Sequence, residues 1–314
     1  MPHAATAAVV TQAPGISLQA ATWRSTGVQH AYGLPDMKKN EKGTLTVNSN
    51  GLTFAAKASS STVPSRLIVA VSSGNQRVEL WGMKGRLLRM AIPDGGGIAA
   101  AGFMHHRVGM LTVEFNDNRG GYHGAVFYLP ANEAERALQS FAQLPTVARD
   151  AAADVCRAPV EPSSVLVSAP AWDQAEVPAA YRALVYEHVV DRLQRVQGVS
   201  HVYRDGEVNA ASACPQYTVH ISITGFSQGS QVKRAVMGPV GMFVGTTQMR
   251  FDTTFTDASG RWDTHDQVKA TVRGESESTN VADSVAKTIA KHYASAKKEY
   301  EKASVEGRNE TAHR

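Results

Sequence analysis

The sequence predicts an α+β protein of two domains: an antiparallel β-barrel capped by a C-terminal helix, then an α/β sandwich of mostly antiparallel strands with two helices. The chain of 314 residues is long for one compact core. Its first half alternates apolar and polar residues as strands do, whereas its second half mixes strand patterns with helical ones. Hydrophobic residues make up 43% of the chain and charged residues 19%, the balance of a folded globular protein.

Hairpin patterns dominate the first half. Strands are predicted over residues 43–57 (a hairpin turning at 48–51), 65–73, 76–82 and 110–130 (a hairpin turning at 116–121). Pro130 ends the last strand, and the apolar residues of 131–144 recur at helical spacing. This half therefore ends on an amphipathic helix.

The segments "GTLTV", "GLTF", "VPSRLIVAVSSGNQRVELW", "LTVEFND" and "GAVFYLP", followed by that helix, resemble bacterial pleckstrin-homology (PH)-like domains. The resemblance spans residues 40–145 and implies a PH-like barrel with little chemistry of its own. Eukaryotic PH domains that hold phosphoinositides carry Lys and Arg in the first hairpin loop. Here that turn is Asn48-Ser49-Asn50-Gly51, so we do not expect inositol-phosphate binding.

The second half follows the order βαββ, a loop, and ββα. Strands are predicted over residues 164–170, 200–204, 217–226 and 247–275, the last as a hairpin turning at 257–260. A helix is predicted over 177–196, with Tyr181, Leu184, Val185, Val189 and Leu193 on its apolar face.

A final helix is predicted to begin near Asn280. The Asn280 side chain caps it, with Asp283 at the third helical position in a variant of the capping box. The apolar stripe of this helix consists of Val281, Val285, Ile289 and Tyr293.

The segments "FSQGSQVKRAVMGPVGMFVGTTQMRFDTTFTDASG" and "RGESESTNVADSVAKTIAKHY" resemble a family of uncharacterised exported bacterial domains. That family is related in outline to envelope lipoproteins of the curli-secretion and penicillin-binding-protein-activator groups. The chain lacks the lipobox cysteine of such lipoproteins, so we expect no lipid anchor. The predicted divisions are a disordered N-terminal segment (1–22), a PH-like domain (23–145), a linker (146–162), an envelope-type α/β domain (163–303) and a disordered tail (304–314).

Residues 229–245, "GSQVKRAVMGPVGMFVG", raise the question of a ligand loop. They do not contain the GxxxxGK[ST] pattern of a phosphate-binding loop, and Pro239 disfavours a helix-packing GxxxG. The segment is predicted to connect two strands, with its glycines allowing close backbone approach. Contact with a membrane or partner is the alternative, through Lys233, Arg234, Met242 and Phe243.

A second apolar segment, residues 95–109, is flanked by basic side chains. One interpretation is that Arg86, Arg89 and Arg107 contact an anionic surface. The alternative is that the segment is a loop folded over the end of the barrel. Its Gly-rich start is not a dinucleotide site, because this half is antiparallel. His105 and His106 are adjacent, so on a strand they point to opposite faces and do not share a metal.

The two cysteines, Cys156 and Cys214, fit either a disulfide in an exported protein or two separate thiols in a cytosolic one. Residues 1–15 lack the basic start and apolar run of a signal peptide, although their alanines suit the remnant of a leader. We expect a periplasmic or envelope-associated protein, with the cytoplasm as the alternative. No run of apolar residues reaches the roughly 20 that a transmembrane helix needs.

The charge and motifs exclude several function classes. A net charge of +4 without a basic stripe argues against nucleic-acid binding. We expect no cofactor, no metal site and no catalytic residues, because no complete motif for any of them is present. The leading hypothesis is a non-enzymatic binding or scaffolding protein of the bacterial envelope with a protein or lipid partner. A peripheral module for anionic membrane surfaces is second, and a hydrolase is third; the oligomeric state is left open.

Overall fold

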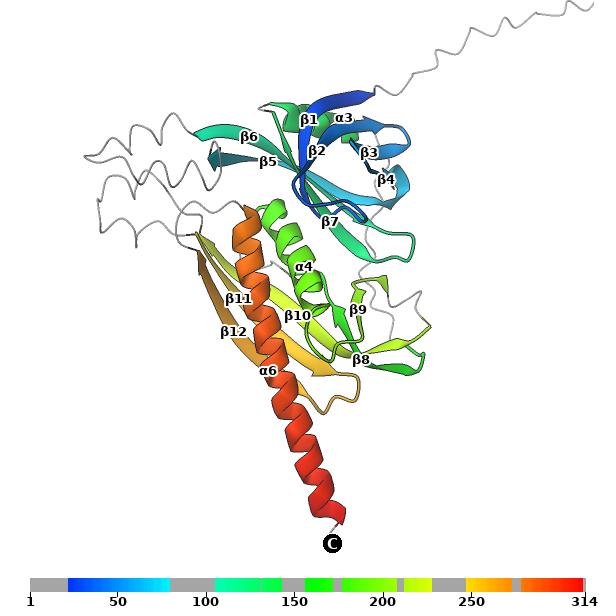
Figure 1. Ribbon diagram of the computed structural model, residues 1–314, viewed down its shortest axis with the longest axis vertical. Helices are drawn as coiled ribbons and strands as arrows, with labels where there is room; N and C mark the ends of the chain where they lie inside the picture. Colours follow the sequence, from blue (N-terminus) through cyan, green and yellow to red (C-terminus); the bar gives the residue numbers. More distant parts are fainter. Residues whose placement is uncertain are drawn as a thin grey trace, which may run out of the picture.

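The computed structural model describes residues 22–79, 105–130, 132–142, 156–171, 177–207, 212–227, 247–272 and 278–312. Two β-sheets and three α-helices make up this described part, so the protein is of the α+β class. One sheet comes from each half of the chain, and helices α4 and α6 run beside the second (Figure 1).

The first sheet has seven strands in the order β4-β3-β2-β1-β7-β6-β5. The strands are β1 (Trp23–Tyr32), β2 (Glu41–Asn48), β3 (Gly51–Ala56), β4 (Ser60–Pro64), β5 (Ile68–Glu79), β6 (His105–Asn116) and β7 (Tyr122–Leu129). Every pairing in it is antiparallel, and α3 (Glu133–Phe141) follows the last strand. Within the described residues no pairing joins β4 to β5, so the predicted barrel closure is not confirmed.

Three details of the first sheet differ from the prediction. Strand β1 was not predicted, because a bulge between Thr26 and Val28, with Gly27 at φ 72°, breaks its alternation of apolar and polar residues. The short edge strand β4 was also missed. Residues 65–73 and 76–82, predicted as two strands, contribute to one: β5 runs unbroken through Gly74 to Glu79.

Both faces of strand β7 in the first sheet are covered. All eight residues of β7 are buried. Ala125, Phe127 and Leu129 pack into the core of the first half, together with Phe141 of α3. Val126 and Tyr128 point the opposite way and join a core with the second half. The predicted alternation was right, and the residues on the opposite face of β7 are buried as well.

The second sheet has five strands in the order β12-β11-β10-β8-β9. Its elements are β8 (Val160–Val167), α4 (Ala179–Leu193), β9 (His201–Arg204), β10 (Cys214–Ser227), β11 (Thr247–Asp257), β12 (Asp263–Val272) and α6 (Ser278–Ala312). The predicted order βαββ, loop, ββα is confirmed. Strand β8 is parallel to both β10 and β9, whereas β10, β11 and β12 are antiparallel. Residues 229–245 lie outside the described residues, between the paired strands β10 and β11.

Helix α4 lies between the two halves and is buried nearly all round. The predicted apolar face of α4 is buried, but so are Glu187, His188 and Tyr186 on its other sides. The core that surrounds it contains Val126 and Tyr128 of the first sheet as well as residues of the second sheet and α6. The two sheets therefore share one core through this helix.

Helix α6 begins at Ser278, so the predicted cap at Asn280 is wrong. Asn280 is inside the helix, and Asp283 binds Arg192 of α4 instead of capping. The predicted apolar stripe is confirmed, since Val281, Val285, Ile289 and Tyr293 are all fully buried. The helix continues to Ala312, beyond residue 303 where a disordered tail was predicted. None of the described helices is long and apolar enough to cross a membrane.

Candidate functional site

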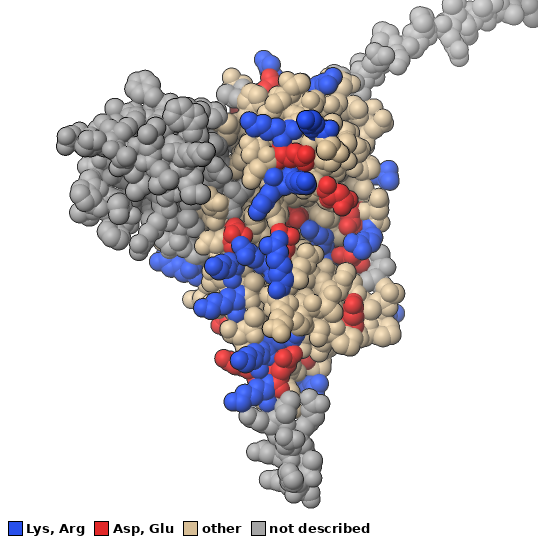
Figure 2. Space-filling view, viewed as in Figure 1, with Lys and Arg blue, Asp and Glu red and all other residues tan. Residues whose placement is uncertain are grey.

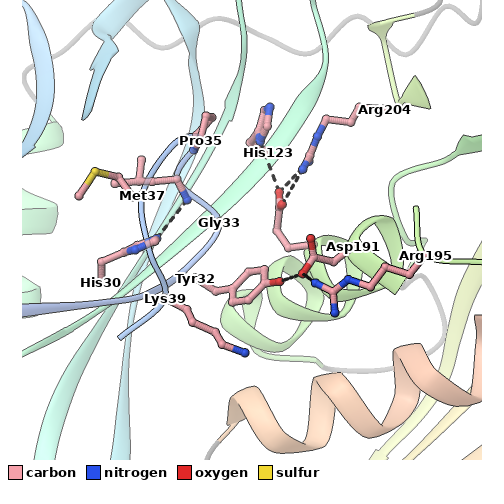
Figure 3. A pocket seen from close by; sticks show the side chains of 12 residues that line it. His30, Tyr32, Gly33, Pro35, Met37, Lys39, His123, Asp191, Arg195 and Arg204 are labelled. Carbon is pink, nitrogen blue, oxygen red and sulfur yellow. Dashed lines mark hydrogen bonds and ion pairs between the residues drawn. The ribbon is translucent and has the colours of Figure 1, made fainter. Parts of the chain in front are cut away.

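A pocket of about 340 Å³ opens where α4 meets the first sheet, and we call it the seam pocket. Residues from both halves line it: His30, Tyr32, Gly33, Leu34, Pro35, Met37, Lys39, His123, Glu187, Asp191, Arg195 and Arg204. Figure 3 shows the β1–β2 connection on one side and the α4 side chains on the other. On the face drawn in Figure 2, acidic and basic residues lie side by side down the middle of the molecule.

The buried imidazole of His30 holds one wall of the seam pocket. Its Nε2 accepts a hydrogen bond from the backbone N–H of Leu34 at 3.1 Å, and its Nδ1 lies 3.0 Å from the carbonyl oxygen of Lys38. Since Nε2 accepts, the Nδ1 atom carries the proton and donates it to Lys38. Burial keeps the pKa of His30 below its ordinary value, which favours this neutral form. His30 therefore fixes the chain that carries Pro35, Met37 and Lys39 into the pocket.

Two charged residues of α4, Glu187 and Asp191, form the opposite wall together with Arg195, which lies in the turn after the helix. Glu187 and Asp191 are four residues apart, so they lie along one face of the helix. Asp191 accepts a hydrogen bond from Arg195 at 3.0 Å and another from the hydroxyl of Tyr32. Burial and the Asp191 carboxylate both raise the pKa of Tyr32, which keeps the hydroxyl protonated. The Tyr32–Asp191 bond therefore ties the first half of the chain to α4.

Glu187 lies at the inner end of the pocket, where it is paired with Arg204 of β9. The guanidinium donates to both carboxylate oxygens, at 2.9 and 2.8 Å, and the backbone N–H of Gly124 donates to the same carboxylate at 3.0 Å. Arg204 also donates to the Tyr122 carbonyl at 2.9 Å. Burial alone would lower the pKa of Arg204, but Glu187 outweighs it and raises that pKa. This bidentate pair joins β9, α4 and β7.

His123 packs beside this pair. Its ring stacks on Phe115 at a centroid distance of 5.1 Å, as expected for a structural histidine facing the apolar side of β7. Its Nδ1 lies 3.6 Å from Glu187 and its Nε2 3.4 Å from Asp117. Burial lowers the pKa of His123 despite these two carboxylates. His123 is therefore neutral at pH 7 and adds no charge to the pocket.

A second polar contact lies on the α6 side of α4. Arg192 donates to both oxygens of Asp283, each at 2.7 Å, and His188 lies 3.5 Å from the same carboxylate. Burial opposes ionisation of Asp283, but the Arg192 bonds hold its pKa below the usual value. The His188 ring stacks on Tyr32 at 4.2 Å. The contacts of His188 with Asp283 and Tyr32 therefore help to position the Tyr32 ring.

The predicted contact residues fall outside this site. Arg86, Arg89, Lys233, Arg234, Met242 and Phe243 lie outside the described residues. Arg107 belongs to β6, where its backbone pairs with Arg77, but its side chain is not described. The predicted contact with a membrane or partner through these residues stays a prediction.

Cys156 and Cys214 form a disulfide with an S–S distance of 2.08 Å. It links the chain preceding β8 to the start of β10 across 58 residues of sequence. Of the two alternatives left open by the sequence, the bonded one is present. In the described part of the chain, no three His, Cys, Asp or Glu side chains are grouped as a metal site requires.

The residues of the seam pocket were not predicted from the sequence. Helix 177–196 was assigned one apolar face, and its charged positions were given no role. One signal was available, because Glu187 interrupts the apolar run "ALVYEHVV", where an unpaired carboxylate is rarely buried. Arg204 and Tyr32 carry no comparable signal, since their partners are 17 and 159 residues away in sequence.

A serine and a histidine also meet on the second sheet. The Ser168 hydroxyl lies 3.0 Å from Nδ1 of His220. This pair is exposed and is not among the residues that line the seam pocket. A hydrolytic serine needs a base, an orienting group and donors for an oxyanion around one enclosed substrate position. An exposed pair of this kind is equally expected of a polar sheet surface.

No protein-family model and no curated protein sequence matches the chain. Among solved structures, the chain is similar to a PelC dodecamer from Paraburkholderia phytofirmans, with 16% identity, a TM-score of 0.30 and coverage of 43% of this chain and 92% of that one. It is also similar to a Xanthomonas campestris protein of family DUF330, with 10% identity, a TM-score of 0.26 and coverage of 45% and 87%. At such TM-scores these likenesses carry no conclusion about function.

Proposed function

We propose that the protein is a non-enzymatic binding or scaffolding protein of the bacterial cell envelope, with the seam pocket as its binding site. The observation that carries the proposal is the pocket itself, formed by both halves of the chain and lined by side chains fixed in advance by their neighbours. His30, Tyr32 and Arg204 each have hydrogen-bond partners on the protein. Preorganised polar groups in a concave site are typical of ligand recognition.

The disulfide supports the placement in the envelope. Disulfides persist in the periplasm and outside the cell, whereas cytosolic thiols are kept reduced. The bond between Cys156 and Cys214 closes a long stretch of chain that contains α4 and β9, and so it holds together the elements that carry Glu187 and Arg204. The fold therefore keeps this cross-link in an oxidising compartment.

A PH-like relationship of the first half is part of this proposal. Seven antiparallel strands followed by a helix that packs on them is the strand count and order of that fold class. PH-like domains commonly serve as binding modules, which agrees with a recognition role. Strands β4 and β5 are the two edges of this sheet, so a closed barrel requires these two strands to approach each other.

Cell fractionation combined with thiol trapping tests the proposal. Cells that produce the full chain are quenched in acid, and free thiols are labelled with a maleimide that shifts the protein on a gel. We expect the protein in the envelope fraction, with no label unless a reductant is added first. Recovery from the cytosol with both cysteines labelled would overturn the envelope assignment. Turnover of a bound molecule by the purified protein would overturn the non-enzymatic assignment.

A further inference from the structure

The charged side chains that line the seam pocket do not balance, so the pocket carries a net charge. Three basic and two acidic side chains line it, and its histidines are neutral, which leaves one net positive charge. Glu187 and Arg204 satisfy each other through two hydrogen bonds. The charges available to a ligand are therefore those of Lys39, Asp191 and Arg195.

These three side chains have hydrogen-bonding capacity left. Asp191 receives both Tyr32 and Arg195 on Oδ2, which leaves Oδ1 as an acceptor. Arg195 uses only Nη2 in this contact, and within the described part of the chain its other guanidinium N–H groups have no hydrogen-bond partner. Within the described residues, the Lys39 ammonium has neither a hydrogen bond nor an ion pair. In Figure 3 the Lys39 side chain extends from the β1–β2 connection below Tyr32, whereas Asp191 and Arg195 lie beyond the hydroxyl end of the Tyr32 ring.

We propose that the seam pocket binds a small molecule that carries one carboxylate and, a few atoms away, a hydroxyl or amino group. Lys39 and Arg195 contact the carboxylate from opposite walls, and Asp191 Oδ1 accepts a hydrogen bond from the neighbouring hydroxyl or amino group. The side chains of Leu34, Pro35 and Met37 contact the carbon skeleton. This inference rests on the proposed binding function and specifies its ligand.

The charge balance favours a carboxylate over a phosphate. A monoanion cancels the single net charge of the lining, whereas a phosphate dianion would leave an excess negative charge beside Asp191 and Glu187. The size agrees, since 340 Å³ is at the lower end of the range for small-molecule pockets.

Ligand-detected NMR with matched pairs of compounds tests the proposal on the purified, oxidised full chain. The pairs are gluconate with sorbitol and lactate with lactamide, because each pair differs in the carboxylate and keeps hydroxyls. Inorganic phosphate is the third arm. We expect saturation transfer to the carboxylates and little to their neutral counterparts or to phosphate. Isothermal titration then gives the Kd of the tightest carboxylate for each variant.

Lys39→Gln and Arg195→Gln should each raise that Kd about tenfold or more, because each removes a charged hydrogen-bond donor. Lys38→Gln is the matched control: its side chain is exposed on the same connection but does not line the pocket, so its Kd should stay that of the wild type. Lys39 is exposed, so its substitution leaves the fold intact and tests the proposal even if Arg195→Gln is unstable.

The inference is overturned if no carboxylate binds at millimolar concentration, if sorbitol and lactamide bind as well as the acids, or if phosphate binds more tightly than every acid. It is equally overturned if Lys39→Gln leaves the Kd unchanged. These readouts use purified protein and do not depend on where the protein resides in the cell. Failure here with an envelope location and intact disulfide would leave the proposed function in place with a different ligand.

Discussion

Helix α4 and its neighbours carry two arginine–carboxylate pairs of similar geometry in different surroundings. In the pair on the first-sheet side, the side chains of Arg204 and Glu187 are 17% and 4% exposed; in the pair on the α6 side, those of Arg192 and Asp283 are 32% and 42% exposed. Breaking a buried pair leaves a charge without solvent or partner, whereas water replaces a lost partner at a half-exposed one. The buried pair should therefore contribute more to the free energy of unfolding than the half-exposed pair, although the bond lengths of the two pairs are similar.

Glu187→Ala is expected to have the largest effect. It leaves the Arg204 guanidinium buried without its carboxylate and removes the acceptor of the Gly124 N–H. We expect the free energy of unfolding to fall by about 3–5 kcal/mol. Urea denaturation of the oxidised protein measures it. A loss below about 1 kcal/mol would mean that water reaches Arg204 and that the two pairs do not differ as argued.

Gly124→Ala tests how closely the first sheet approaches α4 beside the buried pair. A Cβ at this position would lie 2.5 Å from the Cβ of Ala183 and 2.9 Å from its Cα. Strand and helix would have to separate, so we expect a destabilisation of about 1–3 kcal/mol in the same denaturation experiment. Gly74→Ala is the control, because its nearest neighbour would be the flexible Met110 Cε at 3.7 Å. Equal stability of the two variants would contradict the close packing.

Acidification should weaken the contacts on both sides of α4 through His123 of β7 and His188 of α4. Burial keeps the pKa values of His123 and His188 below the 6.5 of the unfolded chain. The folded state therefore binds fewer protons, and the stability is complete above pH 6.5 and lost as the pH falls toward the folded pKa values. Asp117 and Asp283, the carboxylates beside these two histidines, have lowered pKa values and weaken the fold only below their unfolded value of 3.8.

We expect the free energy of unfolding to decline as the pH falls below about 6.5, with each unit of pKa depression contributing about 1.4 kcal/mol. His188→Phe keeps a ring against Tyr32 and removes one titrating group, so its decline should be shallower than that of the wild type. Identical slopes for the two proteins would show that His188 does not contribute to the pH dependence.

Sequence patterns predicted the elements of this fold better than its assembly. The strands 110–130 and the order of the second half followed from alternation and helical spacing, which are local properties. Strand β1 was missed because its bulge at Gly27 shifts the parity of its apolar residues. The cap at Asn280 was misplaced because Asp283 binds Arg192 of another helix, a partner that no local pattern reveals.

The seam pocket shows the same limit more strongly. It requires Tyr32 and His30 from β1 to meet Asp191 of α4 and Arg195 of the turn that follows it, and that meeting depends on how the two halves pack. The only local sign is Glu187, a carboxylate within an apolar helix segment. The parallel pairing of β8 and β9 brings its partner Arg204 into place, and the periodicity of the sequence does not predict that pairing.

The half-exposed pair gives the smallest expected effect and completes the comparison. A double-mutant cycle with Arg192→Gln and Asp283→Asn should yield a coupling energy of about 0.2–1 kcal/mol, because solvent screens both groups. The coupling should shrink further at high salt, since screening acts on exposed charges. A coupling of about 3 kcal/mol or more would match what a buried pair shows on losing one partner. In that case α4 would depend equally on its contacts with the first sheet and with α6, and the bidentate geometry shared by the two pairs, rather than burial, would be the common cause.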